Sequence, residues 1–178
     1  MIRAAIDSGL DALVISDHDR LVSPEHLRTL NAKHAPFRVF GGVEVTLCRE
    51  HALVIGAQDD LLVRRWWTYP DLHALVEERC GLLALAHPFR FNGRIEVDVA
   101  RFPPHALELH SHNTPRRAEP AILAVAAALD VPLLSNSDAH HVGDVGTYYN
   151  QLAEEPEDAA ELVRLLKAGA FTPVAPPG

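Results

Sequence analysis

Short apolar segments alternate with helix-like segments along most of the chain. The apolar segments read as strands are Ala12–Ser16, Arg38–Thr46, Ala52–Ala57, Gly81–Ala86, Ala106–Leu109 and Val131–Ser135. Most of them are continuously apolar rather than alternating, which is typical of strands buried on both faces of a parallel sheet. The pattern therefore predicts an α/β fold built on a parallel sheet.

Helix-start signals lie between these segments. They are Ser23-Pro24-Glu25, Pro70-Asp71, Thr114-Pro115 (with Pro120 delaying the start) and Pro156-Glu157. Each combines a capping residue, an early proline or an acid in the first turn. A further helix at Ile2–Ser8 comes directly before the first strand, whereas a βα series would place a strand ahead of it. We therefore expect the chain to begin inside a βα unit.

The length and the uninterrupted pattern indicate one domain. A chain of 178 residues is long enough to bury a sizeable core. No internal repeat, low-complexity tract or linker divides it. We expect a single domain over residues 1–178, with the proline-rich residues 172–178 as an extended tail.

Composition narrows the cellular setting. Hydrophobic residues make up 48% and charged residues 22% of the chain, which is ordinary for a globular protein. No uncharged run approaches the length of a membrane span, and the N-terminal residues lack the apolar block of a secretory signal. Cys48 and Cys80 are too few for a disulfide framework and are expected to be buried thiols. We expect a cytoplasmic protein.

The charge and the histidine content change the functional picture. A formal net charge of −8 argues against extended, sequence-independent binding of nucleic acid. It leaves room for a small phosphorylated substrate, because bound cations can invert the local field. The chain also contains 11 histidines, and histidines that converge in space favour metal or acid–base chemistry.

Acids and imidazoles lie at or just after the predicted strands. The positions concerned are Asp17-His18, Glu44, His51, His87, Glu108 with His110 and His112, and Asp138-Ala139-His140. In a parallel sheet or barrel the carboxyl ends of the strands share one edge, where active sites are built. Imidazole and carboxylate ligands suit zinc, manganese or iron. The repeated placement predicts one shared metal site.

Each position also has a simpler interpretation. His18 fits a solvated loop and His51 an edge position. Glu44 lies in an apolar strand, where a carboxylate is costly unless it is paired, metal-bound or solvated. Whether His110 or His112 joins the site stays open.

Five segments together resemble the PHP (polymerase and histidinol phosphatase) family. They are GLDALVISDHD, GGVEV, HALVIG, LALAHPFR and NSDAHHVGDVG, in the family's order and over about residues 5–173. The resemblance implies a distorted (βα)7-type, TIM-like barrel. It also implies one to three divalent metal ions at the carboxyl ends of the strands.

The resemblance assigns roles to particular residues. The implied metal ligands are His18, Glu44, His51, His87, Asp138 and His140. Of these, Glu44 (as the bridging carboxylate), Asp138 and His140 are implied to be catalytic. Arg90, just after His87, is a candidate phosphate contact because a guanidinium matches a phosphate group.

The chain departs from the family pattern at its start. The family's first strand carries H-x-H, and no such motif precedes Ser16. His110-Ser111-His112 has the right letters but follows a late strand. The barrel is therefore expected to be incomplete at its N-terminus. Glu44, His51 and His87 still suffice for one metal, whereas the remaining ligands would form poorer sites.

Three hypotheses follow. The first is a phosphoesterase that hydrolyses a small phosphomonoester or nucleotide through metal-activated hydroxide. The second is a metal-binding but catalytically weak module with a regulatory or partner-subunit role, in which an open sheet edge supports a homo-oligomer. The third places the missing strand in coding sequence upstream of Met1.

Overall fold

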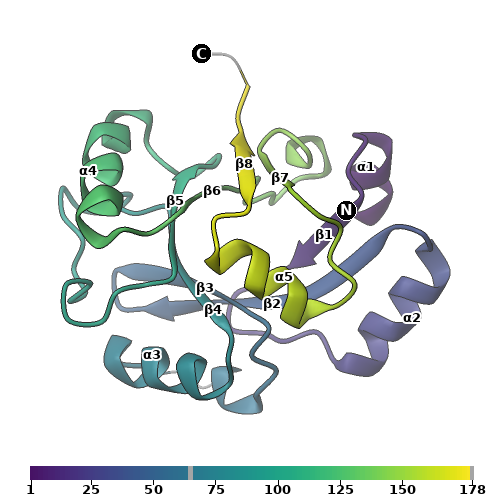
Figure 1. Cartoon of the computed structure of the whole chain (residues 1–178), viewed down its shortest axis with the longest axis horizontal. Coiled ribbons are helices and arrows are strands. Elements are labelled where there is room, and N and C mark those ends of the chain that lie inside the picture. The colour runs from purple at the N-terminus through teal and green to yellow at the C-terminus, as the bar shows by residue number, and fades with distance from the viewer. Residues whose placement is uncertain (64–65, 177–178) are drawn as a thin grey trace.

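The computed structural model describes residues 1–63 and 66–176 (Figure 1). Its helices are α1 (Ile2–Asp7), α2 (Pro24–His34), α3 (Tyr69–Glu78), α4 (Glu119–Leu129) and α5 (Ala159–Lys167), with short 3-10 turns η1 (Asp60–Val63), η2 (Arg116–Ala118) and η3 (Val142–Asp144). Its strands are β1 (Ala12–Ile15), β2 (Arg38–Leu47), β3 (Glu50–Ile55), β4 (Leu82–Ala86), β5 (Ala106–His110), β6 (Leu133–Ser135), β7 (Tyr149–Leu152) and β8 (Phe171–Val174). The fold is mixed α/β, as the sequence pattern predicts.

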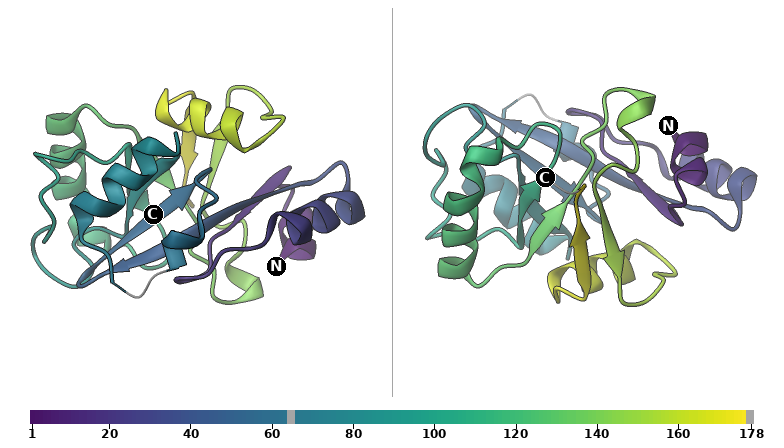
Figure 2. Two further views of the ribbon diagram at one scale, coloured as in Figure 1. Left: turned by 90° about the horizontal axis from the view of Figure 1, so that it is seen from below. Right: turned by 90° about the horizontal axis from the view of Figure 1, so that it is seen from above.

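Strands β1 to β6 form one curled sheet in sequence order (Figure 2). The pairs β1–β2, β4–β5 and β5–β6 are parallel. The curled sheet is consistent with an incomplete TIM-like barrel. The count of seven βα units stays a prediction.

The direction of β3 corrects the sequence prediction. We expected a parallel sheet, but β3 is antiparallel to both β2 and β4. Only Cys48 and Arg49 connect β2 to β3, and a parallel crossover needs a dozen residues or more. Cys48 takes a positive φ of 56° in this turn. Both Cys48 and Cys80 are exposed, so the expectation of buried thiols was wrong.

Helices cover both faces of the sheet. On one face, α3 and α4 pack Leu72, Val76 and Ile122 against β2–β5, and α1 and α2 extend this layer over β1 and β2. On the opposite face, α5 packs Leu162 and Leu166 against alternate residues of the same strands (Figure 1). Strands buried on both sides explain the continuously apolar segments of the sequence.

The helix-start signals predicted helices that exist, but some of the helices begin at other residues than predicted. Ser23 caps α2, since its Oγ accepts the backbone N–H of His26 at 3.2 Å. Helix α3 begins one residue before the predicted proline, capped by Thr68. The start predicted at Thr114-Pro115 yields only the short turn η2, and α4 itself begins at Glu119.

The sequence pattern missed the hairpin β7–β8. These strands pair antiparallel from Tyr149↔Val174 to Leu152↔Phe171. Ser135 fastens the hairpin to β6, because its Oγ donates to the carbonyl oxygen of Val174 at 2.6 Å. Part of the predicted tail thus belongs to β8, while residues 177–178 lie outside the described residues. None of the helices in the described part of the chain is long and apolar enough to cross a membrane.

Candidate metal centre

Three imidazoles surround one carboxylate oxygen of Glu44. The distances to Oε1 are 2.7 Å from His51 Nδ1, 3.1 Å from His87 Nε2 and 3.9 Å from His18 Nε2. The ligand atoms of His18, Glu44 and His51 all lie within 4.8 Å of one another. We call Glu44, His18, His51 and His87 the Glu44 cluster. The four residues come from four separate segments of the chain.

Backbone pairing fixes His18 beside Glu44. The segment after β1 continues along β2, where the N–H of Glu44 donates to Asp17 O (3.2 Å) and the N–H of Asp19 donates to Glu44 O (2.9 Å). The Asp19 carboxylate then accepts both the N–H and the hydroxyl of Thr46. These bonds hold His18 at the mouth of the sheet, where 45% of its side chain is exposed.

The reversal of β3 is what delivers His51. His51 lies at the start of β3, paired with Thr46 of β2 on one side and Ala86 of β4 on the other. Because β3 runs against its neighbours, its first residues lie at the edge where theirs end. A parallel β3 would have placed His51 at the opposite edge.

A hydrogen bond to a buried glutamate, Glu108, fixes the backbone of His87. The side chain of His87 is only 2% exposed, and its backbone has a φ of 31°. The Glu108 Oε1 atom accepts the N–H of His87 (2.9 Å) and the hydroxyl of Thr114 (2.9 Å), and its Oε2 accepts Asn136 Nδ2 (2.9 Å). A left-handed backbone at a non-glycine residue persists only where its surroundings enforce it, and Glu108 supplies that support.

Glu108 has a supporting role that the sequence analysis did not assign to it. The signal was present, because Glu108 interrupts an apolar strand in the same way as Glu44 does, and a buried carboxylate needs partners. Burial raises the pKa of the Glu108 carboxyl, while the hydrogen bond from Asn136 and the charge of His87 only partly oppose this. Glu108 therefore belongs to the support of the site rather than to its reactive edge.

Asp138 and His140 extend the cluster past His18. The ring centroids of His140 and His18 are 6.3 Å apart. His140 Nδ1 lies 3.7 Å from Asp138 Oδ1, and Asp138 Oδ2 accepts Asn113 Nδ2 at 2.6 Å. Asp138, like His87, has a positive φ (47°). All six predicted ligands thus lie along one edge of the sheet, with Glu44 contacted by three of them.

The charge states inside the cluster reinforce one another. Burial alone would raise the pKa of the Glu44 carboxyl, but hydrogen bonds from His51 and His87 and the charge of His18 hold it well below its usual range. Burial lowers the pKa of His87, yet its bond to Glu44 and the nearby Glu108 raise it overall. Glu44 is therefore an anion at neutral pH and attracts cations.

Arg90 lies beside the cluster without entering it. Its guanidinium lies over the Phe91 ring, 5.1 Å from the centroid, and that ring lies 5.6 Å from the ring of His51. A hollow of about 300 Å³ opens here, lined by Cys48, Arg49, His51 and Phe91. A substrate reaching the cluster would meet these side chains.

The two histidines left open by the sequence lie elsewhere. His112 Nε2 is 4.0 Å from Asp144 Oδ1, and its ring meets Tyr148 edge-on. His110 lines a different pocket. Neither contacts Glu44 among the hydrogen bonds and ion pairs of the described residues.

The donor set fits a divalent metal ion. It offers a buried, ionised carboxylate oxygen and imidazole nitrogens close enough to share one ligand sphere, the combination that zinc and related metals take in proteins. Buried partners such as Glu108 orient these ligands, as outer groups do in metalloproteins.

Sequence comparison with known proteins gives a match over one part of the chain. Residues 120–171 match the family model described as PHP-associated (PHP_C). A sequence search of curated proteins found no match.

Solved structures resemble the chain over nearly its whole length. PsfC from Pseudomonas syringae has a TM-score of 0.68 at 20% identity, covering 98% of this chain and 80% of that one. A two-domain protein from Bacteroides vulgatus, containing a predicted PHP-like metal-dependent phosphoesterase, has a TM-score of 0.73 at 14% identity. The match covers 98% of this chain and 60% of that protein.

A third structure, from Bifidobacterium adolescentis, is described as a putative metal-dependent phosphoesterase. It has a TM-score of 0.66 at 14% identity, covering 94% of this chain and 89% of that one. At these identities the likeness concerns the fold. The chain thus shares its fold with PHP-like proteins, and its residues 120–171 match the PHP-associated model.

Proposed function

We propose that the chain is a metal-dependent phosphoesterase that hydrolyses a small phosphomonoester or nucleotide. The observation that carries the proposal is the Glu44 cluster, in which imidazoles from three segments meet one ionised carboxylate oxygen. The fold shared with PHP-like phosphoesterases supports the same reaction class.

The chain's own residues divide the work. Glu44, His18, His51 and His87 hold metal at the centre of the site. Asp138 would hold the metal ion that carries the nucleophile. His140, together with His18, would bind a further metal ion or assist protonation of the leaving group. Two or three ions of zinc, manganese or iron are proposed for this reaction, and they would supply Lewis-acid chemistry at the phosphoryl oxygens and a hydroxide nucleophile near neutral pH.

Substrate binding is proposed for the side of Arg90. Its guanidinium lies next to Phe91 at the border of the hollow beside His51, and guanidinium groups pair well with phosphate. A hollow of about 300 Å³ suits a small substrate. The net charge of −8 disfavours a long nucleic acid.

The test is phosphate release from small phosphoesters with and without metal. Chelated protein should be inactive, and added Mn²⁺ or Zn²⁺ should restore turnover. His87→Ala should lower turnover by about 100-fold or more, at the upper end of effects seen when a metal site is disrupted. His26→Ala, an exposed histidine on α2, is the matched control and should keep normal activity. Normal turnover by His87→Ala would refute the proposal.

A second candidate is the metal-binding module without efficient turnover. It is favoured by the state of Asp138 and His140. The Asp138 carboxylate already accepts a hydrogen bond from Asn113, and the side chain of His140 is 57% exposed. Metal analysis by mass spectrometry separates the two. Three ions per chain favour the enzyme, and one or none favours the module. In the module, the free edge of β1 would pair with a second copy, giving a dimer by ultracentrifugation.

A further inference from the structure

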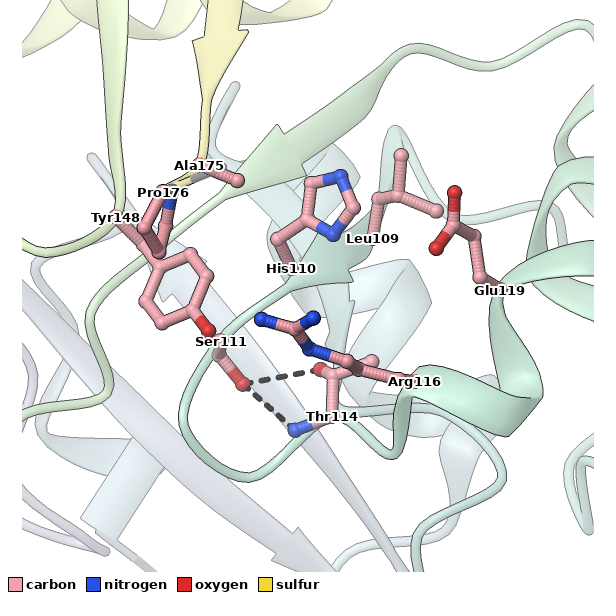
Figure 3. Close-up of a pocket in the computed structure, with 9 residues that line it drawn as sticks. All are labelled: Leu109, His110, Ser111, Thr114, Arg116, Glu119, Tyr148, Ala175 and Pro176. Carbon is pink, nitrogen blue, oxygen red and sulfur yellow. Dashed lines mark hydrogen bonds between the residues drawn. The ribbon is translucent and has the colours of Figure 1, made fainter. Parts of the chain in front are cut away.

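A second pocket lies beyond the Glu44 cluster, on the far side of the β5 end. Its volume is about 200 Å³. It is lined by Leu109, His110, Ser111, Thr114, Arg116, Glu119, Tyr148, Ala175 and Pro176. These residues come from the end of β5, from η2 and the start of α4, from the loop before β7, and from the segment after β8 (Figure 3).

Several polar side chains meet here with unused hydrogen-bonding capacity. Within residues 1–63 and 66–176, no hydrogen bond or ion pair engages the guanidinium of Arg116, the imidazole of His110 or the hydroxyl of Tyr148. Figure 3 shows the Arg116 guanidinium between the ring of His110 and the Tyr148 hydroxyl. The Arg116 guanidinium can only donate, and the His110 ring and the Tyr148 hydroxyl can each donate as well, so the three groups together can bind an anion.

The pocket is separated from the Glu44 cluster by a wall of hydrogen-bonded side chains. Ser111 Oγ and Thr114 Oγ1 lie 3.0 Å apart, and Ser111 Oγ also accepts the N–H of Thr114 (Figure 3). Thr114 donates to Glu108, which in turn holds the backbone of His87. A molecule in the pocket therefore contacts Ser111 and Thr114 on the side that faces away from the Glu44 cluster. It does not lie where a substrate bound at Glu44 would lie.

The size and lining restrict the ligand further. A space of about 200 Å³ corresponds to roughly six or seven water molecules, which suits inorganic phosphate or a four-carbon acid. Glu119 stands on the other side of Leu109 from Arg116 (Figure 3), so a ligand with a hydroxyl or ammonium group at its far end is accommodated. A dianion extended over both ends would be repelled by Glu119.

We propose that this pocket is a second binding site, for a small organic anion. Arg116 binds the carboxylate or phosphate group, and Tyr148 and His110 complete its hydrogen bonds. The site is independent of metal binding at Glu44.

The test is an amide NMR titration of the full chain in the presence of a chelator. The probes are inorganic phosphate and 4-hydroxybutyrate, each raised to about 20 mM, which reveals even millimolar affinity. Saturable shifts are expected at the amides of Ser111, Thr114 and Tyr148. Arg116→Gln should weaken binding by about tenfold or more, the usual effect of losing a charged hydrogen-bond partner. The neighbouring Arg117→Gln, which does not line the pocket, is the matched control.

The outcomes separate cleanly. Saturable shifts lost in Arg116→Gln and kept in Arg117→Gln support the proposal, and the tighter of the two probes shows whether phosphate or carboxylate is preferred. Absence of saturable shifts at these three amides overturns it, as does equal binding by Arg116→Gln. Shifts confined to His51 and His87 overturn it too, because the anion would then bind at the Glu44 cluster. Tyr148→Phe gives a second variant if Arg116→Gln fails to fold.

Discussion

Two groups of histidine and glutamate lie at opposite edges of the sheet and differ in how their hydrogen bonds are used. In the Glu44 cluster, three imidazoles approach the same carboxylate oxygen. At the other edge, His105 Nδ1 accepts the N–H of Leu83 (2.9 Å) while its Nε2 lies 2.7 Å from Glu77 Oε1. His73, stacked on His105, bonds separately to the carbonyl oxygen of Pro103.

The difference separates a structural histidine from a candidate metal ligand. Each nitrogen of His105 has its own partner, one donor and one acceptor, which satisfies a neutral imidazole completely. In the Glu44 cluster, two imidazoles instead lie within hydrogen-bond distance of one carboxylate oxygen, and a third lies 3.9 Å from it. Residue types alone therefore do not mark the candidate metal centre. The convergence of several imidazoles on one oxygen does.

The effect of added metal on thermal stability should distinguish the two edges of the sheet most strongly. Added Mn²⁺ or Zn²⁺ should raise the melting temperature of the wild-type chain. A free metal concentration of one hundred times the dissociation constant should add about 2.7 kcal/mol to the free energy of unfolding. Glu77→Gln should keep this gain, because its carboxylate serves His105 only. Glu44→Gln should lose it, because the shared anionic ligand is gone. Thermal unfolding with and without metal measures the effect.

One result would contradict this prediction. If the metal-induced rise in melting temperature survives in Glu44→Gln and disappears in Glu77→Gln, the metal binds at the other edge of the sheet. Each variant is its own reference, since the comparison is between its melting temperatures with and without metal.

The support behind His87 should have a smaller but measurable effect. Glu108 accepts three hydrogen bonds, and Glu108→Gln turns one accepting oxygen into a donor that opposes one of those partners. His87 would then be less firmly oriented, and metal affinity should fall by about 10- to 100-fold, as is usual for groups that orient ligands. Calorimetric metal titration measures this change.

Thr114→Ser is the matched control for Glu108→Gln, because it keeps the hydroxyl that Glu108 accepts. Its metal affinity should stay near that of the wild type. If Glu108→Gln lowers the melting temperature but leaves metal affinity unchanged, Glu108 stabilises the fold and has no role in positioning His87.

The sequence anticipated the strands well because their burial is written into local composition. All six apolar segments form strands of the main sheet. The direction of β3 was missed, since apolarity reports burial and not orientation, although the two-residue connection at Cys48 and Arg49 carried that information. The short strand β8 was missed because Pro173 and its neighbours resemble a tail and gain order only by pairing with β7.

The sequence predicted the residues that form the Glu44 cluster but not the residues that support them. His18, Glu44 and His87 follow the strand-end pattern, and His51 reaches the same edge through the reversed strand. Glu108 was left without a role, and its partners Thr114 and Asn136, with Asn113, are ordinary loop residues in sequence. Their roles depend on long-range contacts, such as the bond from Asn136 to Glu108, which no local pattern encodes.

The smallest predicted effect concerns acid stability at the His105 edge. Burial lowers the pKa of His105, and Lys167 acts in the same direction, while Glu77 partly opposes both. A proton added at Nδ1 would also confront the N–H of Leu83 that this nitrogen accepts. The folded state therefore binds this proton less readily than the unfolded state, whose ordinary value is 6.5. By linkage, stability is unaffected well above that pH and falls as the pH drops below it.

Replacement of the imidazole should flatten this dependence. The free energy of unfolding of His105→Gln, measured by urea denaturation with a chelator between about pH 5 and 7, should change less with pH than that of the wild type. His26→Gln, at an exposed position on α2, should follow the wild type. A His105→Gln curve parallel to the wild type would mean that His73 or the Glu44 cluster carries the acid sensitivity. The loss of the ring also costs the bond to Leu83, so the whole curve is expected to lie lower, and the slope rather than the height decides the question.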